Sequence, residues 1–172
     1  MRKDLEFVVK VEDLRKVDDI VFRGKEYDTC VSFKIGKTDG ENSIYHHVDN
    51  EFFGVFYYEP RIELQKKWKL TKEELGNHGL GLFLRNSKYS FTKQLHVGDD
   101  VKVYSIFARI KDTDLPKLRA VHKMVRNGEL INTRRDELVI VGLEAESHLT
   151  SLNDYPIIKS QFESIGYQTR VF

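Results

Sequence analysis

One segment near the middle of the chain carries aromatic residues at helical spacing, and it is the one long helix that the sequence predicts. We expect this helix to begin at Asp49 or Asn50, either of which is a good N-cap, and to run toward Trp68. Pro60 should kink it, because proline has no N–H to donate and crowds the preceding turn. A stripe this apolar is typical of a buried helix. The residues of the stripe are Phe52, Phe53, Phe56, Tyr57, Leu64 and Trp68.

A period of two, which is typical of strands, governs the chain on both sides of this helix. Asn127-Gly128 is a strong signal for a two-residue hairpin between the last two strands. A strand, a buried helix and a meander of long strands together predict an α+β fold, in which an antiparallel sheet wraps around a long central helix. The predicted strands are 27–35 before the helix, and 82–91, 101–110, 118–125 and 129–141 after it.

We expect one domain with a short appendage at each end, because the sequence has no internal repeat, low-complexity tract or Pro/Gly-rich linker. A short helix is expected between Val11 and Ile20, and a capping box at Thr71 opens another. Pro156 and Gly166 are the start and stop signals of a terminal helix. The boundaries are 1–24 for the N-terminal appendage, 25–145 for the domain and 146–172 for the helical tail.

Composition excludes several classes of protein. Hydrophobic residues make up 40% of the chain and charged residues 32%, which argues against disorder, and no apolar run approaches the roughly 20 residues that span a bilayer. The first residues lack the apolar stretch of a signal peptide, and the single cysteine, Cys30, is expected in the core. The net charge of +1 arises from interspersed Lys and Glu, which gives no general attraction to nucleic acid. We therefore expect a cytoplasmic protein with no nucleic-acid partner and no membrane span.

Three segments resemble acyl-CoA thioesterases of the hotdog fold. His47-Val-Asp-Asn-Glu-Phe-Phe-Gly-Val-Phe-Tyr-Tyr-Glu-Pro-Arg-Ile-Glu-Leu is similar to the family's central-helix signature, a His-Val-Asn-Asn motif followed by aromatic residues and Glu-x-Ala-Arg-x-Glu. Gly79-Leu-Gly-Leu-Phe-Leu-Arg resembles the connection into the family's second strand, and Ser87-Lys-Tyr-Ser-Phe-Thr-Lys-Gln-Leu-His-Val-Gly-Asp-Asp-Val resembles the strand pair that follows. The resemblance covers about residues 27 to 143. It implies a single hotdog domain similar to the 4-hydroxybenzoyl-CoA and acyl-ACP thioesterases.

The resemblance also implies a reaction, the hydrolysis of acyl thioesters of coenzyme A or of acyl carrier protein. Two other hotdog functions stay open: a non-catalytic acyl-CoA-binding module, and an enoyl-thioester hydratase or dehydratase. Hotdog hydratases typically show Asp-x-Asn-Pro-x-His, whereas Asp39, Asn42 and His46 have a different spacing and no proline. Hydrolysis is therefore the first hypothesis.

Thioester hydrolysis needs a carboxylate that activates water or attacks the carbonyl, and a donor for the developing oxyanion. The free N–H groups at the start of the central helix can supply that donor. Asp39 and Asp49 are the candidate catalytic carboxylates, although the first also suits a turn and the second an N-cap. Lys37 replaces the first carboxylate of the family's pre-helix Asp-x-Asp, so that only Asp39 carries over. An alternative alignment, in which Asp49 begins the motif, shortens the helix, and we therefore favour Asp39.

His47 falls on the family's histidine, which implies a catalytic role in polarising the thioester carbonyl. The sequence shows neither the histidine spacing of a metal site nor a Gly-rich phosphate loop, so no metal or cofactor is expected. A lone hotdog protomer leaves sheet edges exposed, so we expect a homodimer or homotetramer whose site draws on two subunits. The residues expected to contact the acyl-CoA or acyl-ACP substrate are Asn42, Tyr45, His46, Asn50 and Phe53.

Overall fold

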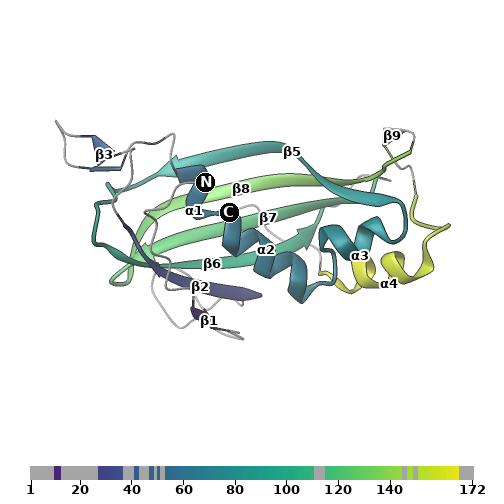
Figure 1. Ribbon diagram of the computed structural model, residues 1–172, viewed down its shortest axis with the longest axis horizontal. Helices are drawn as coiled ribbons and strands as arrows, with labels where there is room; N and C mark the ends of the chain where they lie inside the picture. The colour runs from purple at the N-terminus through teal and green to yellow at the C-terminus, as the bar shows by residue number, and fades with distance from the viewer. Residues whose placement is uncertain are drawn as a thin grey trace.

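The computed structural model shows a curved antiparallel sheet with a helix lying across one of its faces (Figure 1). This arrangement confirms the α+β class predicted from the sequence. The structure describes residues 10–12, 27–36, 41–42, 47–48, 50, 53–110, 115–144, 147–148 and 151–166, and for 10–12, 41–42 and 147–148 it describes the backbone alone.

The main sheet has the strand order β1-β2-β6-β7-β8-β5, and β9 pairs with β8. All neighbouring strands are antiparallel, and the short strands β3 and β4 form a separate antiparallel pair. The five strands predicted from the period of two are β2, β5, β6, β7 and β8. The strands are β1 (Lys10–Glu12), β2 (Thr29–Lys34), β3 (Glu41–Asn42), β4 (His47–Val48), β5 (Leu80–Phe91), β6 (Asp100–Arg109), β7 (Lys117–Arg126), β8 (Glu129–Gly142) and β9 (Ser147–His148).

The central helix is divided in two. Phe53 is its first described α-helical residue, Asn50 is described ahead of it but residues 51–52 are not, and the helix is interrupted at Tyr57. Pro60 explains the interruption, because it has no N–H to donate to the carbonyl of Phe56 and its ring crowds that carbonyl. Asp49, the other proposed N-cap, lies outside the described residues. The helices are α1 (Phe53–Phe56), α2 (Tyr58–Lys67), α3 (Lys72–Gly76) and α4 (Pro156–Ser164).

The N-terminal part of the chain differs from its prediction where it is described. Val11 lies in β1, which pairs antiparallel with β2, whereas the sequence pattern predicted a helix from this residue onward. A strand here pairs with the backbone N–H and C=O groups along the outer edge of β2. This pairing is made with a distant part of the chain, so the spacing of residues within the segment does not predict it. Residues 13–20 of the expected helix lie outside the described residues.

The local signals for turns and caps are confirmed. Asn127 and Gly128 have φ values of 51° and 78°, which are the left-handed values that a two-residue hairpin between β7 and β8 requires. The hydroxyl of Thr71 accepts a hydrogen bond from the N–H of Glu74, whose carboxylate accepts one from the N–H of Thr71 in return. This reciprocal pair closes the first turn of α3.

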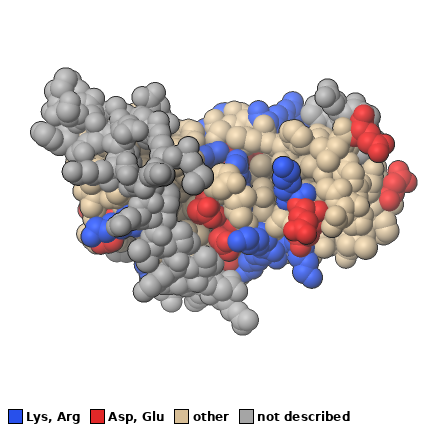
Figure 2. All heavy atoms as spheres, in the orientation of Figure 1, with Lys and Arg blue, Asp and Glu red and all other residues tan. Residues whose placement is uncertain are grey.

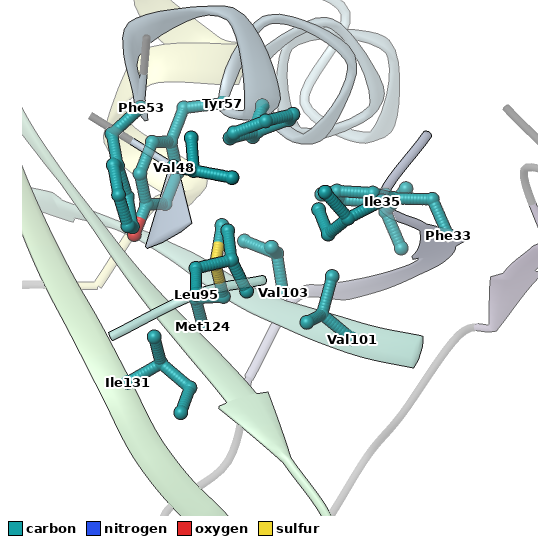
Figure 3. Packing of buried hydrophobic residues seen from close by; sticks show 12 residues of the cluster. Phe33, Ile35, Val48, Phe53, Tyr57, Leu95, Val101, Val103, Met124 and Ile131 are labelled. Carbon is teal, nitrogen blue, oxygen red and sulfur yellow. The ribbon is translucent and has the colours of Figure 1, made fainter. Parts of the chain in front are cut away.

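Two apolar clusters fill the space between the helices and the sheet. The first lies beneath α1, where Phe53 and Tyr57 point from the helix toward the strands (Figure 3). The second lies beneath α2, α3 and α4 and includes Leu64, Leu118 and Ile158. The predicted C-terminal helix therefore helps to close the core at the end of the sheet beside α3 (Figure 1).

The end of the central helix is fixed to the sheet by one carboxylate. Asp28 accepts a hydrogen bond from the indole N–H of Trp68 at 2.9 Å and another from the backbone N–H of Phe107 at 2.8 Å. Because Asp28 directly precedes β2 and Phe107 lies in β6, three elements meet at this side chain. This anchor sets where α2 crosses the sheet.

Candidate functional site

The predicted site begins at the strand pair that precedes α1. Asn42 in β3 and His47 in β4 are direct register partners. The N–H of Val48 donates to the carbonyl of Leu95 at 2.7 Å, which ties β4 to the loop between β5 and β6. Because Val48 is buried in the first apolar cluster, His47 is held at the approach to the central helix.

The other predicted residues are only partly described. Asn50 is exposed just ahead of α1. Phe53 is buried in the core and makes an edge-to-face contact with Phe91 of β5, with ring centroids 5.0 Å apart. A direct contact of Phe53 with the substrate stays a prediction. The predicted site residues outside the described part are Asp39, Tyr45, His46 and Asp49.

A row of polar residues, which the sequence analysis did not identify, crosses the helix-facing side of the sheet between the two apolar clusters. Each member is the register partner of the next, so the row runs without a gap from β2 through β6, β7 and β8 to β5. The members of this polar row are Thr29, Ser105, His122, Arg134 and Tyr89.

His122 is the centre of the polar row. Its Nδ1 lies 2.7 Å from the hydroxyl of Ser105, and its Nε2 lies 3.9 Å from the carboxylate of Asp136. Burial lowers the pKa of the imidazole to about 4, and the positive charges of Arg134 and Arg61 act in the same direction, against the opposing effect of Asp136. His122 is therefore neutral at neutral pH.

Ser105, His122 and Asp136 have the residue types of a nucleophilic triad, but their surroundings do not suit that role. All three side chains are buried, so the serine hydroxyl has no open path to a substrate. The 3.9 Å between His122 and Asp136 exceeds hydrogen-bond distance, so the carboxylate does not orient the imidazole directly. The group is polar packing inside the sheet.

Arg134 links the polar row to the central helix. Its Nε donates to Asp136 at 2.7 Å, and the hydroxyl of Ser87 donates to the same carboxylate oxygen at 2.5 Å. The guanidinium carbon lies 5.6 Å from the ring centroid of Tyr57 and 5.3 Å from that of Tyr89, within the range of cation–π attraction. Arg134 is thus held between the helix and the edge strand β5.

Tyr57 closes over this arrangement from the helix side. Its hydroxyl donates to the side-chain oxygen of Asn132, and its ring centroid lies 5.6 Å from that of His122. Burial, with a further contribution from Tyr89, raises the pKa of Tyr57 well above its usual value. The phenol remains protonated and acts as a donor.

The sequence contained a signal for the polar row. In β8, Asn132, Arg134 and Asp136 alternate with outward-facing residues, so the period of two already placed all three on one face. His122 shares that face as the register partner of Arg134. Only strand order and register show that these residues are neighbours.

Strand β5 forms one end of the main sheet (Figure 1), and it carries exposed apolar side chains. These are Phe83, Leu84, Tyr89 and Phe91, which are each between 37% and 50% exposed. On the face seen in Figure 2, by contrast, basic and acidic side chains mix along the middle of the described surface. The edge at β5 is therefore the apolar candidate for contact with another chain.

Comparison with known proteins decides the family. The family model of the Thioesterase-like superfamily matches residues 33–155, which include the central helix and every member of the polar row except Thr29. The chain belongs to this superfamily. The family predicted from the central-helix residues is thereby confirmed, and the protein is a thioester hydrolase by membership of it. None of the curated proteins matches the sequence.

Solved structures confirm the hotdog fold of this thioesterase-like protein. DHNA-CoA thioesterase from Staphylococcus aureus superposes with a TM-score of 0.64 at 14% identity, over 78% of this chain and 88% of that one. A predicted thioesterase from Bacillus stearothermophilus gives 0.62 at 17% identity, over 82% and 98%. SAV2348 from Staphylococcus aureus, solved in complex with CoA, gives 0.59 at 11% identity, over 100% and 92%. At sequence identities this low, the similarity shows a shared fold and nothing more specific.

In the part of the chain that the structure describes, no group of His, Cys, Asp and Glu side chains is arranged to hold a metal ion. No helix within the described ranges has the length and apolar character needed to cross a membrane.

Proposed function

We propose that the protein hydrolyses acyl thioesters of coenzyme A. The observation that carries the proposal is the match to the Thioesterase-like superfamily over residues 33–155. Two structural neighbours support coenzyme A as the carrier: one is named as a DHNA-CoA thioesterase, and another was solved with CoA bound.

In the proposed mechanism, Asp39 activates the attacking water, and His47 with the N–H groups at the start of α1 binds the carbonyl oxygen. The register of β3 and β4 supports this grouping, because Glu41 pairs with Val48. Asp39 precedes Glu41 by two residues and Asp49 follows Val48 directly, so both carboxylates are connected to the same end of the strand pair. Hydrogen bonds to the carbonyl oxygen stabilise the oxyanion as water attacks.

The proposed site is completed in a homodimer formed through β5. This strand is an edge of the sheet, and its exposed aromatic side chains begin beside α1, where Phe91 contacts Phe53. Pairing of two copies along β5 would satisfy unpaired backbone groups and cover this apolar surface. It would also bring the central helices of both copies close to one substrate.

A panel of acyl-CoA and acyl-ACP thioesters, followed by release of free thiol, tests the proposal. We expect hydrolysis of at least one acyl-CoA, and loss of that activity in Asp39→Asn. Binding of acyl-CoA without thiol release would indicate a non-catalytic module, and hydration of an enoyl-CoA would indicate the hydratase class. Either result would contradict the proposal.

A further inference from the structure

Arg134 is a buried cation whose hydrogen-bonding capacity is only partly used. The residue is 6% exposed, yet among the described residues its guanidinium makes one hydrogen bond, from Nε to Asp136. The two terminal nitrogens carry four further N–H donors. Neither terminal nitrogen is among the side-chain atoms that are both fully buried and without a hydrogen-bond partner, so this end of the guanidinium reaches the surface of the described part of the chain and is open to an acceptor from outside it.

The charges around Arg134 favour a negatively charged acceptor. The positive charges of Arg134 and Arg61 lower the pKa of the buried His122, and the negative charge of Asp136 opposes them. His122 itself is neutral. The remaining donors of Arg134 belong to a cation, so they bind a negatively charged acceptor more strongly than a neutral one.

The position of Arg134 relates it to the proposed reaction centre. Phe91, which packs against Phe53 at the start of α1, is the register partner of Asn132, and Tyr89 is the partner of Arg134. Two residues along a strand correspond to about 7 Å. The partly exposed rings of Phe91 and Tyr89 stack with centroids 5.9 Å apart and form a surface between the two points.

We propose that Arg134 binds a carboxylate at the far end of the substrate's acyl group, so that the enzyme selects short dicarboxylic acyl-CoA thioesters. The inference rests on the proposed function. The acyl chain lies along Phe91 and Tyr89, and its carboxylate accepts two hydrogen bonds from the fork of Arg134. Beyond Arg134 the polar row is buried, so it offers no surface along which a longer saturated chain could lie.

The test compares acyl groups of equal length with and without the terminal carboxylate. Succinyl-, glutaryl- and adipoyl-CoA are assayed against butanoyl-, pentanoyl- and hexanoyl-CoA, and kcat/KM is measured for each. We expect the wild-type protein to prefer the carboxylated member of at least one pair by about tenfold or more, as a charge-assisted hydrogen bond implies. Equal or better hydrolysis of all the methyl-terminated thioesters would overturn the inference and leave thioester hydrolysis intact. Absence of thiol release from every substrate would instead contradict the proposed function.

Variants test whether Arg134 causes the preference for a terminal carboxylate. Arg134→Lys keeps the charge beside Asp136 but loses the planar fork, so the preference should fall about tenfold. Arg135→Lys is the matched control, because Arg135 is exposed on the opposite face of β8. This variant should prefer the carboxylated substrate as strongly as the wild type does. The double variant Arg134→Gln with Asp136→Asn removes both charges together and should also lose the preference. An unchanged preference in both Arg134 variants, or dissociation of the oligomer in Arg134→Lys, would overturn the assignment.

Discussion

Ser105 and His122 lie side by side on β6 and β7, with the serine hydroxyl 2.7 Å from Nδ1 of the imidazole and both side chains fully buried. This contact holds a neutral histidine inside the sheet. A buried histidine with one hydrogen-bond partner and a nearby carboxylate links the stability of the fold to pH.

Stability should fall as the pH falls through the range between 6.5, the ordinary pKa of histidine, and about 4, the pKa of His122 in the folded protein. In this range the unfolded chain binds a proton that the folded protein rejects, so protonation favours unfolding. The contribution of His122 is complete above pH 6.5 and amounts to about 3 kcal/mol. Denaturant unfolding of the wild type at a series of pH values measures the slope.

His122→Asn should reduce this slope, because asparagine does not titrate and can still accept from Ser105. His78→Asn is the control, since His78 is exposed beyond the end of α3. A slope that is the same in His122→Asn as in the wild type would show that other groups cause the pH dependence.

The catalytic carboxylate can be assigned from two conservative variants. Asp39→Asn keeps the shape of the side chain but removes the base, and it should lower turnover by about 100-fold or more. Asp49→Asn should have a much smaller effect, because asparagine caps a helix about as well as aspartate. Turnover on the best thioester is measured, with folding followed by circular dichroism. An inactive Asp49→Asn beside a nearly normal Asp39→Asn would mean that Asp49 is the base.

The proposed dimer depends on the apolar edge at β5. Phe83→Lys places a charge on this edge in both copies, and we expect light scattering to show the mass of a monomer, with thioester hydrolysis reduced in parallel. Phe83 is 50% exposed, so the substitution removes little core packing. Ile157→Lys on α4, at a residue 59% exposed, should leave the mass unchanged. A wild-type protein that is monomeric at micromolar concentration would rule the dimer out.

Thioester hydrolysis should survive exhaustive treatment with EDTA, because the proposed mechanism uses a carboxylate and hydrogen-bond donors without a metal ion. Thiol release is measured before and after chelation. Activity that is lost in EDTA and restored by zinc or manganese would reveal a metal site that the proposed mechanism omits.

Local patterns were sufficient to predict the strands, the hairpin at Asn127-Gly128 and the capping box at Thr71, because each depends on backbone preferences and contacts within a few residues. The resemblance in the segment from His47 onward correctly indicated the family. The interruption at Tyr57 was also implied by Pro60. The N-cap at Asp49 or Asn50 stays a prediction, because Asp49 and residues 51–52 lie outside the described part of the chain.

The polar row required the folded sheet. Ser105, His122 and Arg134 lie far apart along the chain, and each alone is an inward-facing polar residue in a strand. They become neighbours only through the order β6-β7-β8 and its register, because a shift of one residue would turn every side chain of a strand to the other face. The same register places Tyr89 beside Arg134. The hairpin at Asn127-Gly128 is a local signal for the pairing of β7 with β8 alone, whereas no local signal specifies the pairing of β6 with β7 or of β8 with β5.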